Sequence, residues 1–221
     1  MKKKKLIISI VSIAVGTLVL AVAIPFSILG IRTANLNSDY SYLKNDATYK
    51  EKVEVTGLKL VTQHVSCGYA SIEMVSTYYG SPVTEDELDA RNKTVSTSST
   101  NGFLKEINKS IPGKSFLKST YAKNDLLLKE IHTSLKNNNP VVIEWAAKYE
   151  NEWTLHFSVV SGLDLKNDNV TVYNPYGYLE NITTGEFINR TTFRAYDHMP
   201  LFLNFGFAFG AFDKNTIFYA E

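Results

Sequence analysis

The sequence of 221 residues contains a single cysteine, Cys67, and this scarcity excludes several kinds of site. One cysteine cannot form an internal disulfide, a cysteine-rich zinc cluster or a CxxC redox motif. The sequence also lacks the phosphate-binding patterns GxGxxG and Walker A, and the metalloprotease pattern HExxH. The sequence therefore contains none of the common motifs for nucleotide-dependent or zinc-dependent chemistry, and no metal or organic cofactor is expected.

Neither sign of charge is in excess. The 23 Lys and Arg residues nearly balance the 22 Asp and Glu residues. Four of the lysines, Lys2–Lys5, stand at the extreme N-terminus, so the remainder of the chain is mildly acidic. A nucleic-acid-binding surface requires clustered positive charge. Neither a nucleic acid nor a nucleotide is expected as a partner.

One long apolar run is present, Leu6–Ile31, with 26 residues and no charge. A bilayer core requires about 20 apolar residues, whereas the apolar region of a cleaved signal peptide has about 7–15. Cleavage after Ala21-Val22-Ala23 would leave an apolar new N-terminus, so an uncleaved signal-anchor is favoured. The positive-inside rule keeps the lysines cytoplasmic. The sequence thus predicts a single-pass protein of the cell membrane with an extracytoplasmic domain.

The chain divides into three parts. Residues 1–31 comprise the cytoplasmic lysines and the transmembrane anchor, and residues 32–55 are polar and aperiodic, as expected for a stalk. Residues 56–221 form the remaining domain, which is long enough to bury a sizeable core.

The stretch around Cys67 predicts a helix that begins at this residue and ends near Gly80. Gly68 is expected to let the backbone turn tightly into the helix. A helix N-terminus presents unpaired amides and a positive dipole end, which lower the pKa of a thiol and favour the nucleophilic thiolate. Alternatively, Cys67 is a small buried hydrophobe. The prediction of this helix depends on four apolar residues that have the spacing of one buried helix face: Ala70, Met74, Val75 and Tyr78.

In the rest of the domain, the hydrophobic pattern changes along the chain from one typical of helices to one typical of strands. A capping box, Thr84 with Glu87, predicts a short helix, and residues 95–102 read as a hydroxyl-rich loop with an Asn-Gly turn. This order of elements indicates an α+β domain of two lobes. Further helices are predicted at 103–111, 124–136 and from Thr183, and strands at 53–62, 140–146, 153–162, 169–173, 202–210 and 216–219.

His156 is embedded in a strongly apolar strand, where a lone histidine is more often a core residue than a catalyst. Asn174 follows 18 residues later, at the end of the neighbouring strand, where a hairpin can bring its side chain beside the imidazole. Cysteine, histidine and asparagine together supply a nucleophile, a base and an orienting group. This combination of residue types favours a catalytic site.

The other titratable candidates carry weaker signals. His64 is close to Cys67 in sequence but is expected in an exposed loop, and His132 is expected at the surface. The sequence pattern does not assign His198 to a helix, a strand or the surface. Glu144 and Glu152 flank the His156 strand and are expected at its solvated edge.

Three segments, Gln63–Gly80, His156–Gly162 and Asn174–Gly177, together resemble the C39 and C39-like cysteine peptidase family. The resemblance spans roughly residues 56–221. It implies a papain-like fold of two lobes, with the nucleophile helix in a helical N-terminal lobe and an antiparallel β C-terminal lobe. The implied substrate is a peptide or protein.

The resemblance also implies a role for each site residue. Cys67 is the nucleophile, His156 the general base and acid, and Asn174 the residue that orients the imidazole. Gln63 stabilises the oxyanion, where a fixed donor is worth about 3 kcal/mol. Gln63 lies four residues before Cys67, whereas the family's glutamine usually lies six before it, and Asn174 replaces the aspartate of many C39-like members.

The expected activity is hydrolysis of a peptide (amide) bond through a Cys67 acyl-enzyme. Two alternatives stay open. A transpeptidase or acyltransferase would pass the acyl group to an amine, and a surface binding module of the same fold would have weak or absent catalysis. The short spacing between Gln63 and Cys67 favours the binding module, and the Cys, His and Asn set favours an enzyme.

Overall fold

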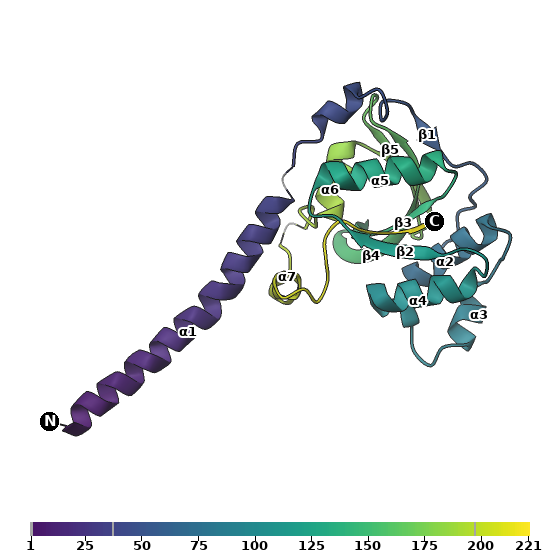
Figure 1. The fold of residues 1–221 in the computed structure, drawn as a ribbon. Helices are drawn as coiled ribbons and strands as arrows, with labels where there is room; N and C mark the ends of the chain where they lie inside the picture. The colour runs from purple at the N-terminus through teal and green to yellow at the C-terminus, as the bar shows by residue number, and fades with distance from the viewer. Residues whose placement is uncertain (1, 37, 197) are drawn as a thin grey trace.

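The computed structural model describes residues 2–36, 38–196 and 198–221. The N-terminal helix α1 (Lys2–Asn35) extends away from the body of the molecule (Figure 1). Its segment Val11–Ala34, of 24 residues, is long and apolar enough to cross a membrane, and 6 % of its most apolar window is buried inside the protein. At 1.5 Å per residue this segment is about 36 Å long. The domain therefore leaves most side chains of Val11–Ala34 uncovered.

The domain is built on one antiparallel sheet in the order β2-β7-β3-β4-β5-β6, with β1 paired to β4. Most of the predicted strands are confirmed, although β1 is far shorter than the predicted strand 53–62. The strands are β1 (Val53–Glu54), β2 (Phe116–Thr120), β3 (Val141–Tyr149), β4 (Glu152–Asp164), β5 (Asn169–Asn174), β6 (Tyr178–Ile182) and β7 (Thr216–Ala220).

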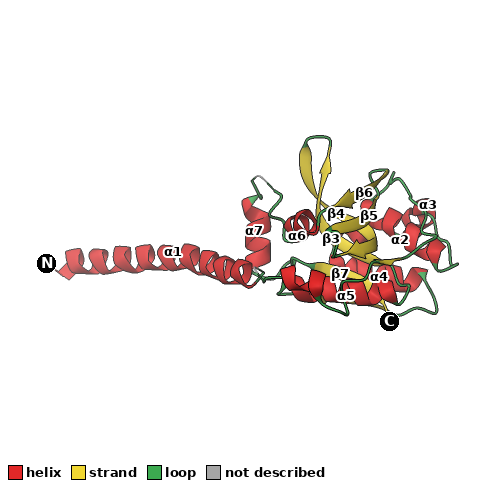
Figure 2. Cartoon of the chain, turned by 90° about the horizontal axis from the view of Figure 1, so that it is seen from above, coloured by secondary structure: helices red, strands yellow, loops and turns green. Residues whose placement is uncertain are grey.

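Helices cover both faces of the sheet (Figure 2). Side chains of β3 alternate between the two sides, so that Val141 and Ile143 pack with α5 and α6, whereas Val142 packs with α2 and α4. The predicted α+β class is confirmed. The helices of the domain are α2 (Cys67–Tyr78), α3 (Glu85–Ala90), α4 (Thr100–Ser110), α5 (Asn124–Lys136), α6 (Thr184–Thr191) and α7 (Leu201–Ala208).

Local signals fix the start of several helices. The Thr84–Glu87 capping box is formed at α3, as predicted. The predicted Asn-Gly turn at residues 101–102 is wrong, because Ser99 caps α4 and accepts a hydrogen bond from the amide of Gly102 at 3.1 Å. The expected role of Gly68 also changes. It lies inside α2, where an added Cβ would come within 2.3 Å of Thr97 Cβ, so this glycine allows close packing and not a turn.

The predicted stalk packs partly on the domain. Leu43, in the 3₁₀ helix η1 (Ser41–Asn45), is fully buried beside α5, and Val53 and Val55 belong to the same core. Part of residues 32–55 is therefore contiguous with the packed domain.

The prediction of β structure at residues 202–210 is wrong, since Leu201–Ala208 form helix α7. Apart from Asn204 the segment has no polar side chain, so it lacks the alternation of apolar and polar residues that is typical of a half-buried strand. A helix satisfies its own backbone hydrogen bonds without a neighbouring strand. Helix α7 lies beside the C-terminal part of α1 (Figures 1 and 2).

Candidate active site

Cys67 is the first residue of α2, as the sequence predicted. Ser66 caps the helix with extended backbone angles, and its hydroxyl accepts a hydrogen bond from the amide of Tyr69 at 3.1 Å. The amides of Cys67 and Gly68 point toward the thiol and act to lower its pKa. The helix start thus places the thiol where unpaired backbone donors converge.

His156 and Asn174 are brought together from two adjacent strands. His156, in β4, is 2 % exposed, and its Nε2 lies 2.9 Å from Oδ1 of Asn174, the last residue of β5. The imidazole stacks on the ring of Tyr176, with centroids 4.0 Å apart and the planes inclined by 22°. The phenol is fixed in turn by a 2.7 Å hydrogen bond between its hydroxyl and Thr154. The imidazole is held from its edge and from one face.

The orientation of the Asn174 amide defines the tautomer of His156. Oδ1 of Asn174 also accepts the backbone N–H of Tyr176 at 2.9 Å, and Nδ2 donates to Oε1 of Glu180 at 2.6 Å. Because an amide N–H can only donate, the oxygen must face the imidazole and Nε2 must carry its proton. Nδ1 of His156 is left with a free lone pair and can act as a base.

The thiol lies near the open end of the β4–β5 ladder. The ladder begins at Val159 and Tyr173, so His156 and Phe157 lie beyond it. The amide of Phe157 faces the Cys67 thiol and acts to lower its pKa. Cys67 therefore lies against the residue that follows His156.

The charge state differs from the expected thiolate. Burial raises the pKa of the Cys67 thiol above its ordinary value of 9.0, outweighing the nearby amides, and the charge of Glu144 adds to the increase. Burial also lowers the pKa of His156 to about 3, with a smaller opposing effect from Asn174 and a further decrease from Arg190. A helix dipole contributes about 0.3–1 kcal/mol, which is less than the cost of desolvating a charged group. Both shifts favour a neutral thiol and a neutral imidazole in the resting site.

Gln63 lies next to the same residues. Its backbone N–H donates to the carbonyl of Pro175 at 2.7 Å, which ties the segment before Cys67 to the turn after Asn174. Its side-chain Oε1 is buried and has no hydrogen-bond partner among the described residues. All four residues singled out from the sequence therefore occupy one region of the structure.

Comparison with known proteins identifies the relatives of this fold. Residues 55–199 match the sequence profile of the Peptidase_C39 like family, which is more than half of the chain. The chain belongs to this family. Comparison with curated proteins finds no match.

Two solved C39 peptidase domains are similar to this C39-like chain. One is a double glycine motif protease from an AMS/PCAT transporter in complex with the leader peptide, with 17 % identity and a TM-score of 0.50 over 76 % of this chain and 97 % of that one. The other is the peptidase domain of Streptococcus ComA, a bi-functional ABC transporter involved in a quorum-sensing pathway. It has 18 % identity and a TM-score of 0.47 over 74 % of this chain and 98 % of that one. At this identity the first likeness shows the fold.

A buried carboxylate that sequence reasoning missed holds the approach to Cys67 in the C39-like domain. Glu85 is fully buried at the start of α3 and accepts the backbone amides of His64, Val65 and Ser66, at 3.0–3.1 Å. Its own amide donates to Glu73 of α2 at 2.7 Å. The Thr84 capping box located this helix start, but nothing in the sequence indicated which loop Glu85 would bind.

A second missed group supports Asn174 from behind. Glu180, in β6, forms an ion pair with Arg190 of α6, with separations of 2.5 and 3.1 Å. Arg190 also donates to the carbonyl of Ala146 at 2.8 Å and lies 3.6 Å from the centroid of the Trp145 ring. The orienting side of the site thus extends from His156 through Asn174 to an anchored ion pair.

Two expectations about the remaining titratable residues are wrong. Glu144 is 3 % exposed, not at a solvated edge, and burial raises its pKa to about 8. Its Oε2 has no hydrogen-bond partner among the described residues. His132 is buried against Tyr49 and contacts the Glu51 carbonyl at 3.2 Å.

Two other expectations hold. Glu152 is exposed, and His64 is an exposed loop residue whose ring contacts Glu85 and Asp86. Those two carboxylates raise the pKa of His64. His64 therefore belongs to the Glu85 region and is not a partner of the thiol.

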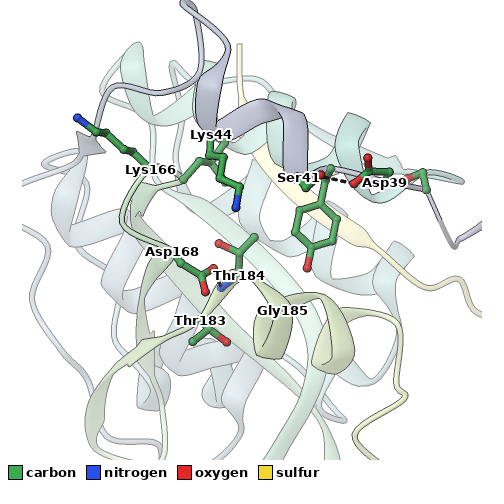
Figure 3. A pocket seen from close by; sticks show the side chains of 11 residues that line it. Asp39, Ser41, Lys44, Lys166, Asp168, Thr183, Thr184 and Gly185 are labelled. Atoms are coloured by element: carbon green, nitrogen blue, oxygen red, sulfur yellow. Dashed lines mark hydrogen bonds between the residues drawn. The ribbon is translucent and has the colours of Figure 1, made fainter.

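A separate cavity of about 490 Å³ lies between the η1 segment, the β4–β5 turn and the start of α6 (Figure 3). Lys44, Lys166 and Asp168 contribute charges of both signs, and Asp168 already accepts the amide of Thr184 at 2.9 Å. Neither Cys67 nor His156 lines it. Within the described ranges, no group of three or more His, Cys, Asp or Glu side chains is arranged to hold a metal ion.

Proposed function

We propose that this chain is a membrane-anchored cysteine peptidase that hydrolyses a peptide bond through a Cys67 acyl-enzyme. The observation that carries the proposal is the position of Cys67 at the start of α2, against the amide of Phe157, the residue that follows His156, whose Nε2 is held by Asn174. A nucleophile, a base and an orienting group in this relation are the requirements of covalent acyl transfer.

Acylation begins from the neutral pair. Nδ1 of His156 takes the thiol proton as Sγ of Cys67 bonds to the substrate carbonyl carbon, and the carbonyl oxygen becomes an oxyanion. His156 then gives this proton to the leaving nitrogen as the C–N bond breaks, which releases an amine and leaves a thioester on Cys67. Asn174 keeps Nε2 protonated throughout, so the same imidazole nitrogen handles each proton.

Deacylation reverses the roles. Nδ1 of His156 takes a proton from water, and the resulting hydroxide bonds to the thioester carbonyl carbon. When the C–S bond breaks, the proton returns to the sulfur of Cys67 and the acid product leaves. One water is consumed and the enzyme is regenerated.

The oxyanion is stabilised by donors that surround Cys67. The helix-start amides are unpaired and fixed, which makes them suitable donors for a developing charge. Gln63 is the side-chain candidate, because its backbone bond to Pro175 holds it beside Asn174 and its amide nitrogen Nε2 is a hydrogen-bond donor. The backbone amides and the Gln63 side chain can donate to the oxyanion together. The backbone amides do so whatever the number of residues between Gln63 and Cys67.

A peptide is the proposed substrate, and a relative solved with a leader peptide supports this class. Helix α1 is the proposed anchor, with Lys2–Lys5 on the cytoplasmic side and the catalytic domain outside. A preference for leader peptides that end in paired glycines is not part of the proposal.

Incubation of the full chain in lipid nanodiscs with a peptide library, followed by mass spectrometry, tests this function. Cleavage is expected for the native chain, and Cys67→Ala and His156→Ala are expected to abolish it. His198→Ala is the matched control, because this histidine is exposed and distant in sequence from the site. Transfer of acyl groups to added amines would instead identify a transferase, and absence of both products would favour a binding module.

A further inference from the structure

Helix α7 exposes large apolar side chains that no described part of the chain covers. Leu201, Phe202 and Phe209 are 63 %, 71 % and 65 % exposed, and the helix Leu201–Ala208 carries no charged residue. Only Phe207 and Ala208 of this helix are buried. An apolar surface of this kind marks a contact with another molecule or a membrane.

The same helix is fixed to the proposed anchor. The rings of Phe205 and Phe26 meet edge to face with centroids 5.8 Å apart. Arg32 of α1 donates to the carbonyl of Phe207, pairs with Asp213 and lies 4.3 Å from the centroid of the Phe207 ring. The exposed side of α7 therefore continues the apolar surface of α1.

The contacts define the level of α7 along α1. Arg32 lies near the end of the apolar segment Val11–Ala34, where a cationic side chain reaches the headgroup region. Phe26 lies six residues earlier, which corresponds to about 9 Å along the helix axis. Amphipathic helices in a membrane interface are buried by about 5–10 Å. Phe205, which contacts Phe26, therefore lies at the level of the outer acyl chains.

The direction and charges of the segment fit the same environment. Figure 2 shows α7 running across the direction of α1, so a helix α1 along the bilayer normal places α7 in the membrane plane. The pKa of Lys214 is lowered to about 8 by burial and by the charges of Arg194 and Arg32, which places three cationic side chains near one another beside α7. Of the three, Arg194 is exposed, and an exposed cationic side chain at this level can reach lipid headgroups, whereas Lys214 is buried over the ring of Phe207.

We propose that α7 is a second membrane-contact element, which lies in the interface beside α1 with Leu201, Phe202 and Phe209 among lipid acyl chains. This inference rests on the proposed anchoring by α1. Two points of attachment fix the rotation and tilt of the catalytic domain, whereas α1 alone would leave it free to turn. The domain thus presents one constant face to the bilayer.

Lipid quenching of site-specific probes in the full chain tests this contact. Cys67→Ala removes the only native thiol, and single cysteines are then introduced by Phe202→Cys, Ile24→Cys or Asp89→Cys and labelled with an environment-sensitive fluorophore. Ile24 lies in α1, and Asp89 is an exposed residue of α3, far from α1 in both views. Phosphatidylcholine vesicles with a spin label near the headgroup end of the acyl chain supply the quencher.

Quenching at position 202 is expected to exceed that at position 89 by at least about threefold, with a blue-shifted emission. Quenching at position 24 but not at 202 would overturn the inference and leave the anchor intact. Absence of quenching at both positions would overturn the anchor itself. A probe at 202 that escapes the lipid quencher, with cross-linking of the 202 cysteines between two chains, would assign this face to a second copy and overturn the lipid contact.

Discussion

Nδ2 of Asn174 donates a 2.6 Å hydrogen bond to Oε1 of Glu180, and this bond, together with the Tyr176 N–H that Oδ1 accepts, determines which end of the amide faces His156. Without the Glu180 acceptor, only the Tyr176 N–H holds Oδ1 in place, and the amide rotates more readily to present Nδ2 to Nε2 of the imidazole. The opposite tautomer would then be stabilised, with the proton on Nδ1. Glu180 is thus a positioning residue that acts through Asn174.

Replacement of Glu180 by alanine is expected to lower kcat about tenfold with little change in KM, because one charge-assisted hydrogen bond is worth about 1.5 kcal/mol. The substitution also leaves Arg190 buried without its main partner, which costs about 3 kcal/mol of stability. Glu180→Gln keeps an acceptor for Asn174 and is expected to restore most of kcat. Nitrogen-15 NMR of the imidazole reports the tautomer directly. A folded Glu180→Ala protein with native kcat and native tautomer would contradict this role.

Alkylation of Cys67 by iodoacetamide is expected to show no plateau at acidic pH. Burial raises the pKa of the thiol, and the pKa of His156 is lowered to about 3, so no thiolate–imidazolium pair is present between these values. The labelling rate should rise once, above the pH at which a free thiol of glutathione reacts. A rate that stays constant down to pH 5, and that His156→Ala removes, would show a preformed ion pair instead.

Glu144 gives the stability of the domain a specific pH dependence. Its pKa is about 8 when folded and 4.5 ordinarily, so the folded state retains a proton that the unfolded carboxyl has released. His156 acts in the opposite direction, but only below its ordinary value of 6.5. Between about pH 6.5 and 8 the free energy of unfolding should therefore fall as pH rises, by up to about 1.4 kcal/mol per pH unit from Glu144.

Urea unfolding at several pH values, monitored by tryptophan fluorescence, measures this slope. Glu144→Gln preserves the side-chain size and removes the titration, so its curve should be flatter in this range. The raised pKa of His64 adds a slope of the same sign to both proteins, and the difference between the two curves isolates Glu144. Parallel curves would contradict the assignment.

Loss of the Glu85 carboxylate is expected to loosen the segment that leads into Cys67. Glu85→Ala removes the acceptor of three backbone amides and should lower the free energy of unfolding by about 3 kcal/mol. The alkylation rate of Cys67 should change as well, because its helix start is no longer fixed. Glu87→Ala in the same helix removes only the capping box and should cost about 1 kcal/mol without changing that rate. Equal alkylation rates for both variants would show that Glu85 is purely structural.

The candidate site was predictable where its signals are local in sequence. Cys67 before a helical apolar pattern, and His156 and Asn174 on successive strands, each follow from a short segment. Glu180 and Arg190 were not predictable, because their meeting depends on how α6 crosses the sheet. Partner identity over such distances is a property of the tertiary packing.

The two main errors have different physical causes. Glu144 was predicted at a solvated edge, but it lies in the strand Val141–Tyr149. Helices cover both faces of this strand, so neither set of its alternating side chains faces solvent and the sequence shows no polar face. Residues 202–210 were predicted as β structure, although they form a helix. Their apolar character instead fits a helix exposed beside α1, an environment that a single strand could not occupy.

The position of β7 between β2 and β3 determines the order in which the domain can assemble. Residues 216–220 provide Ile217 to one hydrophobic core and Phe218 to the other. Until this strand is synthesised, the edges of β2 and β3 that face it remain unpaired, and both hydrophobic cores lack its side chains. A nascent chain that lacks these residues therefore has no closed sheet to support β4. Any activity of the proposed Cys67 site is therefore expected only after β7 has been synthesised.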